Sequence, residues 1–128
     1  MSKKINQNFN IEPIHVSSHF FIRRNGFTVQ FVNTNDRAWH AGHSSFKGKD
    51  NCNDFSIGIE LEGVDNDFFS ESQYIKLVNL IKCLSLNYPI ENIASHKSIA
   101  LPKGRKNDPG PYFDHSRLKI FKNLNLFF

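Results

Sequence analysis

Alternating apolar and polar positions predict two short β elements in the first half of the chain. The runs HFFIRR (19–24) and FTVQFV (27–32) flank Asn25-Gly26, and this dipeptide between two β-rich runs predicts a hairpin with a type I′ turn. In SIGIELEG (56–63), apolar side chains alternate with polar ones, which predicts a strand with two carboxylates on one face.

A helix is the next clear element. Ser70 begins SESQ, a capping box of the S-x-x-Q form, and Asn87-Tyr88-Pro89 predicts where the helix stops. Between these signals, apolar side chains recur at helical spacing, at Tyr74, Leu77, Val78, Ile81 and Leu84. NIASH (92–96) predicts a short strand that ends at His96.

The remaining segments complete the predicted fold class. Residues 33–54 are rich in Gly, Asn, Ser and Asp and predict a long loop, and long loops in compact domains are often functional. Asp114 predicts the cap of a last helix with Leu118 and Phe121 on its inner face. We therefore expect a single-domain α/β (α+β) protein with a mixed β-sheet flanked by helices.

Charge and composition narrow the classes of function. The chain of 128 residues has a net charge of +4 and a pI of about 9.2, which fits an anionic ligand. The lysines are scattered, and we see no dense basic stripe of the kind that binds nucleic acid. No apolar run reaches the ~18 residues of a membrane span, and the first residues lack the apolar middle of a secretory signal. We expect a cytoplasmic monomer.

A few residue types suggest chemistry, each with a simpler alternative. The segment RKNDPGP (105–111) is either a rigid surface turn or a loop that supplies a metal ligand at Asp108 and a cation at Lys106. His96 at a strand end is more often a hydrogen-bonded structural residue than a metal ligand. Glu60 between Ile and Leu is either a desolvated general base or an ordinary surface charge.

Five motifs in order resemble one family. VSSHFFIRRNG, VQFV, DRAWHAGHSS, CNDFSIGIELEG and SHKSIA…RKNDPGP are similar to the AmpD-type zinc N-acetylmuramoyl-L-alanine amidases, relatives of phage amidase lysozymes and peptidoglycan-recognition proteins. The resemblance covers about residues 16–117. We therefore divide the chain into an N-terminal segment (1–15), an amidase domain (16–120) and a C-terminal tail (121–128).

The resemblance implies a reaction and a set of residues. It implies zinc-dependent hydrolysis of the amide between the lactyl group of 1,6-anhydro-muramic acid and L-alanine, during cell-wall recycling. His96 and Asp108 match zinc ligands, Glu60 matches the catalytic acid/base, and Lys106 matches the lysine that steadies the transition state. On the substrate side, our hypothetical residues are Trp39, His40 and Asn53.

One family feature has no matching position. Family members carry a first histidine ligand on a central strand upstream of the V-S-x-H motif, and we find no such strand before residue 16. Its absence is expected to leave unpaired strand edges. The ligand then comes from an upstream segment or from His15, His19 or His40, or the chain is a decayed amidase that binds muropeptides without cleaving them. A basic interaction module is a third, distant alternative.

Overall fold

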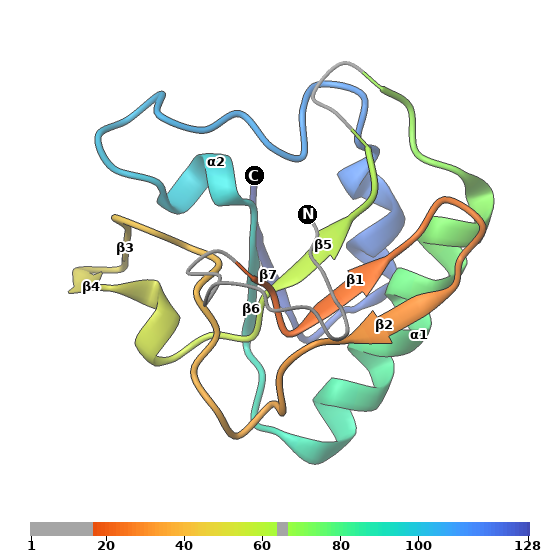
Figure 1. The fold of residues 1–128 in the computed structure, drawn as a ribbon, viewed down its shortest axis with the longest axis horizontal. Helices are drawn as coiled ribbons and strands as arrows, with labels where there is room; N and C mark the ends of the chain where they lie inside the picture. Colours follow the sequence, from red (N-terminus) through yellow and green to blue (C-terminus); the bar gives the residue numbers. More distant parts are fainter. Residues whose placement is uncertain (1–16, 64–66) are drawn as a thin grey trace, which may run out of the picture.

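A three-stranded mixed sheet forms one half of the structure, a computed structural model that describes residues 17–63 and 67–128. The central strand β1 (Phe20–Ile22) pairs antiparallel with β2 (Thr28–Gln30) and parallel with β5 (Ile59–Leu61). The expected hairpin and the expected strand in SIGIELEG are both present, and the α+β class with a mixed sheet is confirmed (Figure 1).

The turn of the β1–β2 hairpin differs from the predicted type. Phe27 accepts a hydrogen bond at its carbonyl from Arg23, and Arg23 accepts one from the Gly26 N–H. Gly26 has a φ of 89°, whereas Asn25 is not in the left-handed region. The loop therefore has three residues and one left-handed position, instead of the two that a type I′ turn requires.

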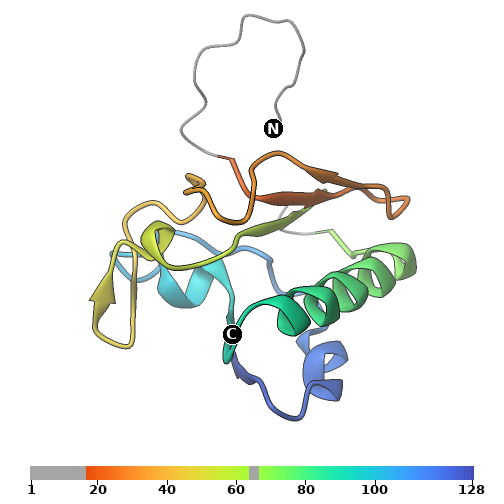
Figure 2. The same ribbon diagram turned by 90° about the horizontal axis from the view of Figure 1, so that it is seen from below.

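The long helix α1 (Glu71–Asn87) lies against one face of this sheet, as Figure 2 shows. The predicted capping box is present, because the Ser70 side chain accepts from the Gln73 N–H and the Gln73 side chain accepts from the Ser70 N–H. The core between helix and sheet consists of Ile22, Tyr74, Leu77, Ile81, Phe113 and Leu118. In the described part of the chain, no helix combines the length and apolarity needed to cross a membrane.

The second half of the chain contains a separate pair of parallel strands. Strand β6 (Asn92–Ala94) pairs with β7 (Asn125–Phe127), so the segment expected to be a tail contributes a strand. The strand predicted to reach His96 ends at Ala94, because Ser95 caps a short helix, α2 (His96–Ile99). Among the described residues, β5 pairs only with β1 and β6 only with β7.

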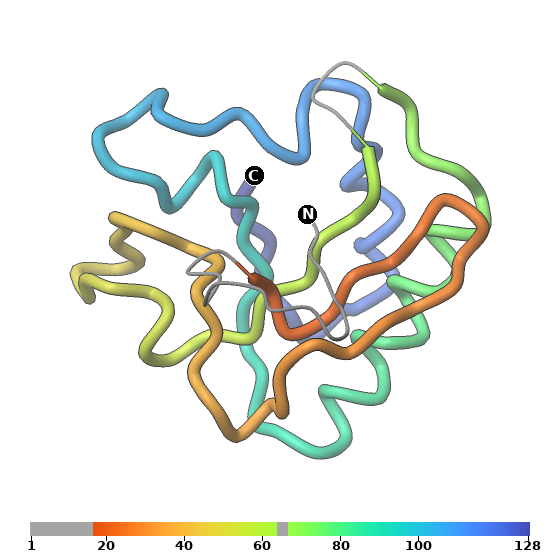
Figure 3. Tube along the Cα trace, viewed as in Figure 1, coloured from red at the N-terminus to blue at the C-terminus, as the bar shows by residue number. Residues whose placement is uncertain are grey.

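The long loop 33–54 folds into a compact lobe beside α2 (Figure 3). It contains the strands β3 (Ser45–Phe46) and β4 (Lys49–Asp50) and the 3-10 helix η1 (Cys52–Asp54). A β-bridge between Ser44 and Ala100 joins this lobe to the end of α2. The last predicted helix is a 3-10 helix, η2 (His115–Ile120), capped by the Asp114 side chain as expected.

Gln73 provides a test of how the helix is joined to the sheet. Its side chain is fully buried and donates to the carbonyls of Ile22 (3.2 Å) and Glu62 (2.9 Å), in addition to its capping role. We expect Gln73→Ala to lower the free energy of unfolding by about 2–3 kcal/mol, since both the cap and the donor to the sheet are lost. Chemical denaturation measures this, with the exposed helix residue Asn79→Ala as control. A loss below about 0.5 kcal/mol for Gln73→Ala would contradict it.

Candidate active site

His96 and Asp108 lie side by side although twelve positions separate them. The first turn of α2 carries His96, and its Nδ1 atom is 3.0 Å from Oδ2 of Asp108. The backbone also joins the two segments, because the Lys97 N–H donates to the Asp108 carbonyl (3.0 Å). The structure thus brings together the two residues that the sequence suggested as metal ligands.

The Ala41 carbonyl fixes which nitrogen of His96 faces Asp108. Nε2 of His96 is 2.9 Å from this carbonyl oxygen, which can only accept, so Nε2 carries a proton. In the neutral ring, Nδ1 then carries no proton, and its lone pair points at a carboxylate oxygen of Asp108. A bare nitrogen lone pair against a carboxylate is repulsive unless a cation lies between them, and that cation is either a proton or a metal ion.

Asp108 is held in a turn and has a low pKa. The Gly110 N–H donates to the Asn107 carbonyl (2.8 Å), so the segment RKNDPGP is indeed a turn, but one that directs Asp108 at His96. Burial raises the pKa of Asp108. The hydrogen bond and charge of His96, with a smaller contribution from the charge of Lys106, outweigh this effect and lower the pKa below its ordinary value. The carboxylate is therefore ionised and available to a cation.

The His96–Asp108 pair fits two corners of a zinc site. Two ligands at ~2.0–2.1 Å from a tetrahedral zinc lie about 3.3 Å apart, close to the 3.0 Å observed. Within residues 17–63 and 67–128, no third His, Cys, Asp or Glu joins the pair to form a metal-binding group. His15, one of the suggested replacements for the first histidine ligand, lies outside the described residues.

His19, a second suggested replacement, has a structural role. Its buried ring accepts a hydrogen bond from the Gly58 N–H at Nδ1 (3.0 Å), so Nε2 carries the proton and donates to the Asp36 carbonyl (2.8 Å). Both nitrogens are used, and neither is left to bind a metal. The ring instead joins the loop 33–54 to the strand that carries Glu60.

Glu60 and His40 lie on the same face of this strand. Glu60 is in β5 and is exposed, so burial does not desolvate its carboxylate in this structure, and its catalytic role stays a prediction. A Cβ atom on Gly58 would lie 2.4 Å from Cγ of His40, so the His40 ring covers Gly58, two residues before Glu60. In the described part of the chain, His40 belongs to no metal-binding group, and its ring centroid lies 5.7 Å from that of His19.

The other two predicted substrate residues differ in their surroundings. Asn53 is buried, and its Oδ1 accepts from the backbone N–H groups of His40 (3.0 Å) and Ala41 (2.8 Å). It therefore holds the loop that carries His40, which is a positioning role. Trp39 is 44% exposed, with the Arg37 guanidinium 4.4 Å from its ring centroid, and its substrate role stays a prediction.

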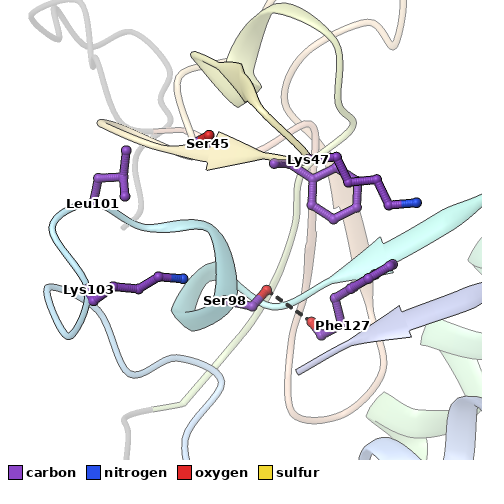
Figure 4. A pocket seen from close by; sticks show the side chains of 7 residues that line it. Ser45, Lys47, Ser98, Leu101, Lys103 and Phe127 are labelled. Atoms are coloured by element: carbon purple, nitrogen blue, oxygen red, sulfur yellow. Dashed lines mark hydrogen bonds between the residues drawn. The ribbon is translucent and has the colours of Figure 1, made fainter.

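A pocket on the α2 side of the lobe contains none of the predicted site residues. Its volume is about 400 Å³, and Figure 4 shows the Ser98 hydroxyl donating to the Phe127 carbonyl (3.0 Å) within it. It is lined by Ser45, Phe46, Lys47, Ser98, Leu101, Lys103 and Phe127.

Comparison with known proteins identifies the family. A family model described as N-acetylmuramoyl-L-alanine amidase matches residues 2–111. The chain belongs to this amidase family. It is 49% identical over 110 residues to the 1,6-anhydro-N-acetylmuramyl-L-alanine amidase AmpD of Haemophilus influenzae, covering 84% of this chain and 59% of that protein. The corresponding AmpD of Escherichia coli is 46% identical over 112 residues, covering 86% and 60%.

Solved amidase structures share the fold. A crystal structure of a selenomethionine AmpD derivative superposes with a TM-score of 0.79 at 46% identity, over 84% of this chain and 60% of that one. The amidase AmiD from E. coli, in complex with anhydro-N-acetylmuramic acid-L-Ala-D-gamma-Glu-L-Lys, gives 0.76 at 34% identity, over 84% and 48%. The chain spans about three-fifths of the length of the AmpD relatives it matches.

Sequence reasoning missed the residues that hold the candidate site together. The Arg105 guanidinium donates to the carbonyls of Leu101 (2.7 Å), His43 (2.9 Å) and Ala41 (3.2 Å). Its partners are backbone carbonyls, which any residue supplies, so no residue pattern marks them. Gly58 was predicted only as a strand position, and the requirement for glycine comes from the distant His40 ring.

Gly58 allows a test of this packing. We expect Gly58→Ala to destabilise the protein by about 1–3 kcal/mol, because the new methyl group overlaps the His40 ring. The double variant Gly58→Ala/His40→Ala should lose less free energy of unfolding than the sum of the two single variants, since the clash is then absent. Additive losses, measured by chemical denaturation, would show that the ring does not pack on Gly58.

Proposed function

We propose that this chain provides a zinc-dependent N-acetylmuramoyl-L-alanine amidase site, which hydrolyses the amide between the lactyl group of an anhydro-muramyl peptide and L-alanine. The observation that carries the proposal is the pairing of His96 Nδ1 with the Asp108 carboxylate while the Ala41 carbonyl holds Nε2. Family membership and the names of the AmpD relatives support the choice of reaction.

His96 and Asp108 would hold the zinc ion. When bound, a zinc ion of this type lowers the pKa of a coordinated water to about 7 and polarises a carbonyl. The Ala41 carbonyl accepts a hydrogen bond from Nε2 and so orients the His96 ring. Metal-binding histidines usually donate their other ring N–H to an acceptor in this way. This arrangement supports binding with Nδ1 rather than Nε2.

Glu60 and Lys106 would act on the protons and charges of the reaction. Glu60 is proposed to take a proton from the attacking water and to return one to the alanine nitrogen as the C–N bond breaks, which leaves a lactyl carboxylate and a free amine. Its exposed position on β5 is consistent with access to water and substrate. Lys106, whose charge acts on Asp108, would offset the negative charge of the tetrahedral oxyanion.

The proposed substrate is a muropeptide, and the proposed setting is cell-wall recycling in the cytoplasm, with the protein acting as a monomer. The names of the AmpD relatives specify the 1,6-anhydro form of the sugar. The AmiD complex in the comparison holds an anhydro-muramyl tripeptide, a ligand of this class. The net charge of +4 is complementary to the carboxylates of such peptides.

The role of Glu60 can be tested with an isosteric change. Glu60→Gln cannot take a proton, so we expect release of the L-alanine-headed peptide from anhydro-muramyl peptide to fall at least ~100-fold, with zinc content unchanged. Glu62→Gln is the matched control on the same strand face, because Glu62 accepts a hydrogen bond from the Arg24 N–H (2.8 Å) and has no proposed catalytic role. Equal turnover by Glu60→Gln and the wild type would refute the assignment.

Zinc binding gives a test that does not depend on turnover. We expect the wild-type chain to retain zinc after dialysis, and His96→Ala and Asp108→Asn to lose most of it, because each change removes one donor of the pair. The exposed His43→Ala is the control and should retain zinc. Elemental analysis by mass spectrometry measures the ratio of metal to protein. Equal zinc content in His96→Ala and the wild type would contradict the ligand assignment.

A further inference from the structure

His40 lies between the two parts of the proposed site. Its ring covers Gly58, two residues before Glu60 on the same strand face. The next residue along the chain, Ala41, supplies the carbonyl that holds His96. Two residues of a strand span roughly 7 Å, a distance that a short peptide crosses with two amide groups. A ligand bound at Glu60 with one amide group or more on the Gly58 side would therefore lie within reach of the His40 ring.

A short hydrogen-bond chain determines the tautomer of His40. The Ser56 hydroxyl is 2.6 Å from the Cys52 carbonyl, which can only accept, so the hydroxyl proton is used there. Ser56 Oγ is also 3.3 Å from Nε2 of His40, and this contact is favourable only if Nε2 donates. Nε2 therefore carries the proton, and Nδ1 has a bare lone pair.

This lone pair is the distinctive feature of the His40 ring. In residues 17–63 and 67–128, His40 Nδ1 has no hydrogen-bond partner. The His40 residue as a whole is half-buried, so part of it remains exposed to solvent. Burial lowers the pKa of His40 to about 4, with further lowering by His19, His96 and Arg37 against an opposing contact with the Ser56 backbone. The ring is therefore neutral near pH 7.

We propose that Nδ1 of His40 accepts a hydrogen bond from an amide N–H of the muropeptide and so determines how the peptide lies against Glu60. The proposal rests on the proposed amidase function and adds a specificity-determining residue to it. A neutral ring with one bare nitrogen selects a donor, whereas Lys106 selects the oxygens of the same ligand. The amide groups of a muropeptide supply N–H donors close to the bond that is cleaved.

The tautomer is tested first, without any ligand. In the full chain labelled with ¹⁵N-histidine, the ring nitrogen shifts of His40 should show a protonated Nε2 and a bare Nδ1 at neutral pH. Ser56→Ala removes the acceptor for Nε2–H, so we expect the two shifts to move towards a mixture of tautomers. A proton on Nδ1 in the wild-type chain would overturn the proposal.

Two substitutions at His40 separate the acceptor from the rest of the ring. In His40→Asn, the side-chain oxygen reaches the position of Nδ1. In His40→Gln, the amide reaches the position of Nε2 and leaves no acceptor at Nδ1. With Glu60→Gln as the background, to prevent turnover, we expect His40→Gln to weaken binding of anhydro-muramyl tripeptide by about 2- to 10-fold, and His40→Asn to restore most of the affinity. Titration calorimetry measures the affinities, and thermal unfolding confirms that both variants are folded.

The ligand supplies the second half of the test. A set of tripeptide ligands, each N-methylated at one amide, removes one N–H at a time. We expect the effect of His40→Gln to disappear with one of these ligands, the one that lacks the donor. If the wild type binds muropeptide but His40→Gln binds it equally well, or no methylation abolishes the difference, this proposal fails and the amidase proposal stands. If the wild-type chain binds no muropeptide, both fail.

Discussion

The carbonyl of Ala41 is the contact on which the candidate site depends. It accepts hydrogen bonds from His96 Nε2 (2.9 Å) and from the Arg105 guanidinium (3.2 Å), while Asn53 holds the N–H of the same residue (2.8 Å). The loop 33–54, helix α2 and the segment RKNDPGP therefore meet at one residue. Without this carbonyl, His96 would lose the acceptor that turns Nδ1 towards Asp108, and a partly buried donor would be left unpaired.

A second set of polar contacts fixes the position of strand β5, which carries Glu60, against the loop 33–54. The buried His19 ring bonds the Gly58 N–H and the Asp36 carbonyl, and Gly58 in turn accepts His19 and Phe20 N–H groups at its carbonyl. Gly58 also leaves room for the His40 ring. Buried polar networks of this kind hold a geometry well only when every member is satisfied. Here the network connects the loop 33–54 to β5 without using any residue that we propose for catalysis.

The sequence best predicted those structural features that depend on residues close together in the chain. The capping box at Ser70 and Gln73, the hairpin and the Asp114 cap need only near neighbours, and all three are present. The end of β6 was misplaced because Ser95 caps a helix, a local signal that the β-like pattern of NIASH hid. The roles of Asn53 and Arg105 could not be predicted, since both bond backbone groups that are far away in sequence.

Three histidines illustrate what the sequence could not separate. His19, His40 and His96 each donate from Nε2 to an oxygen, so all three have Nδ1 as the second, variable nitrogen. In His19 this atom accepts a backbone N–H, in His96 it faces a carboxylate, and in His40 it has no hydrogen-bond partner among residues 17–63 and 67–128. The three rings therefore share one tautomer but differ in role. His19 gives structural support, His96 is the proposed metal ligand and His40 is the proposed substrate contact. The neighbour of Nδ1 decides between them, and that neighbour comes from tertiary structure rather than from spacing along the chain.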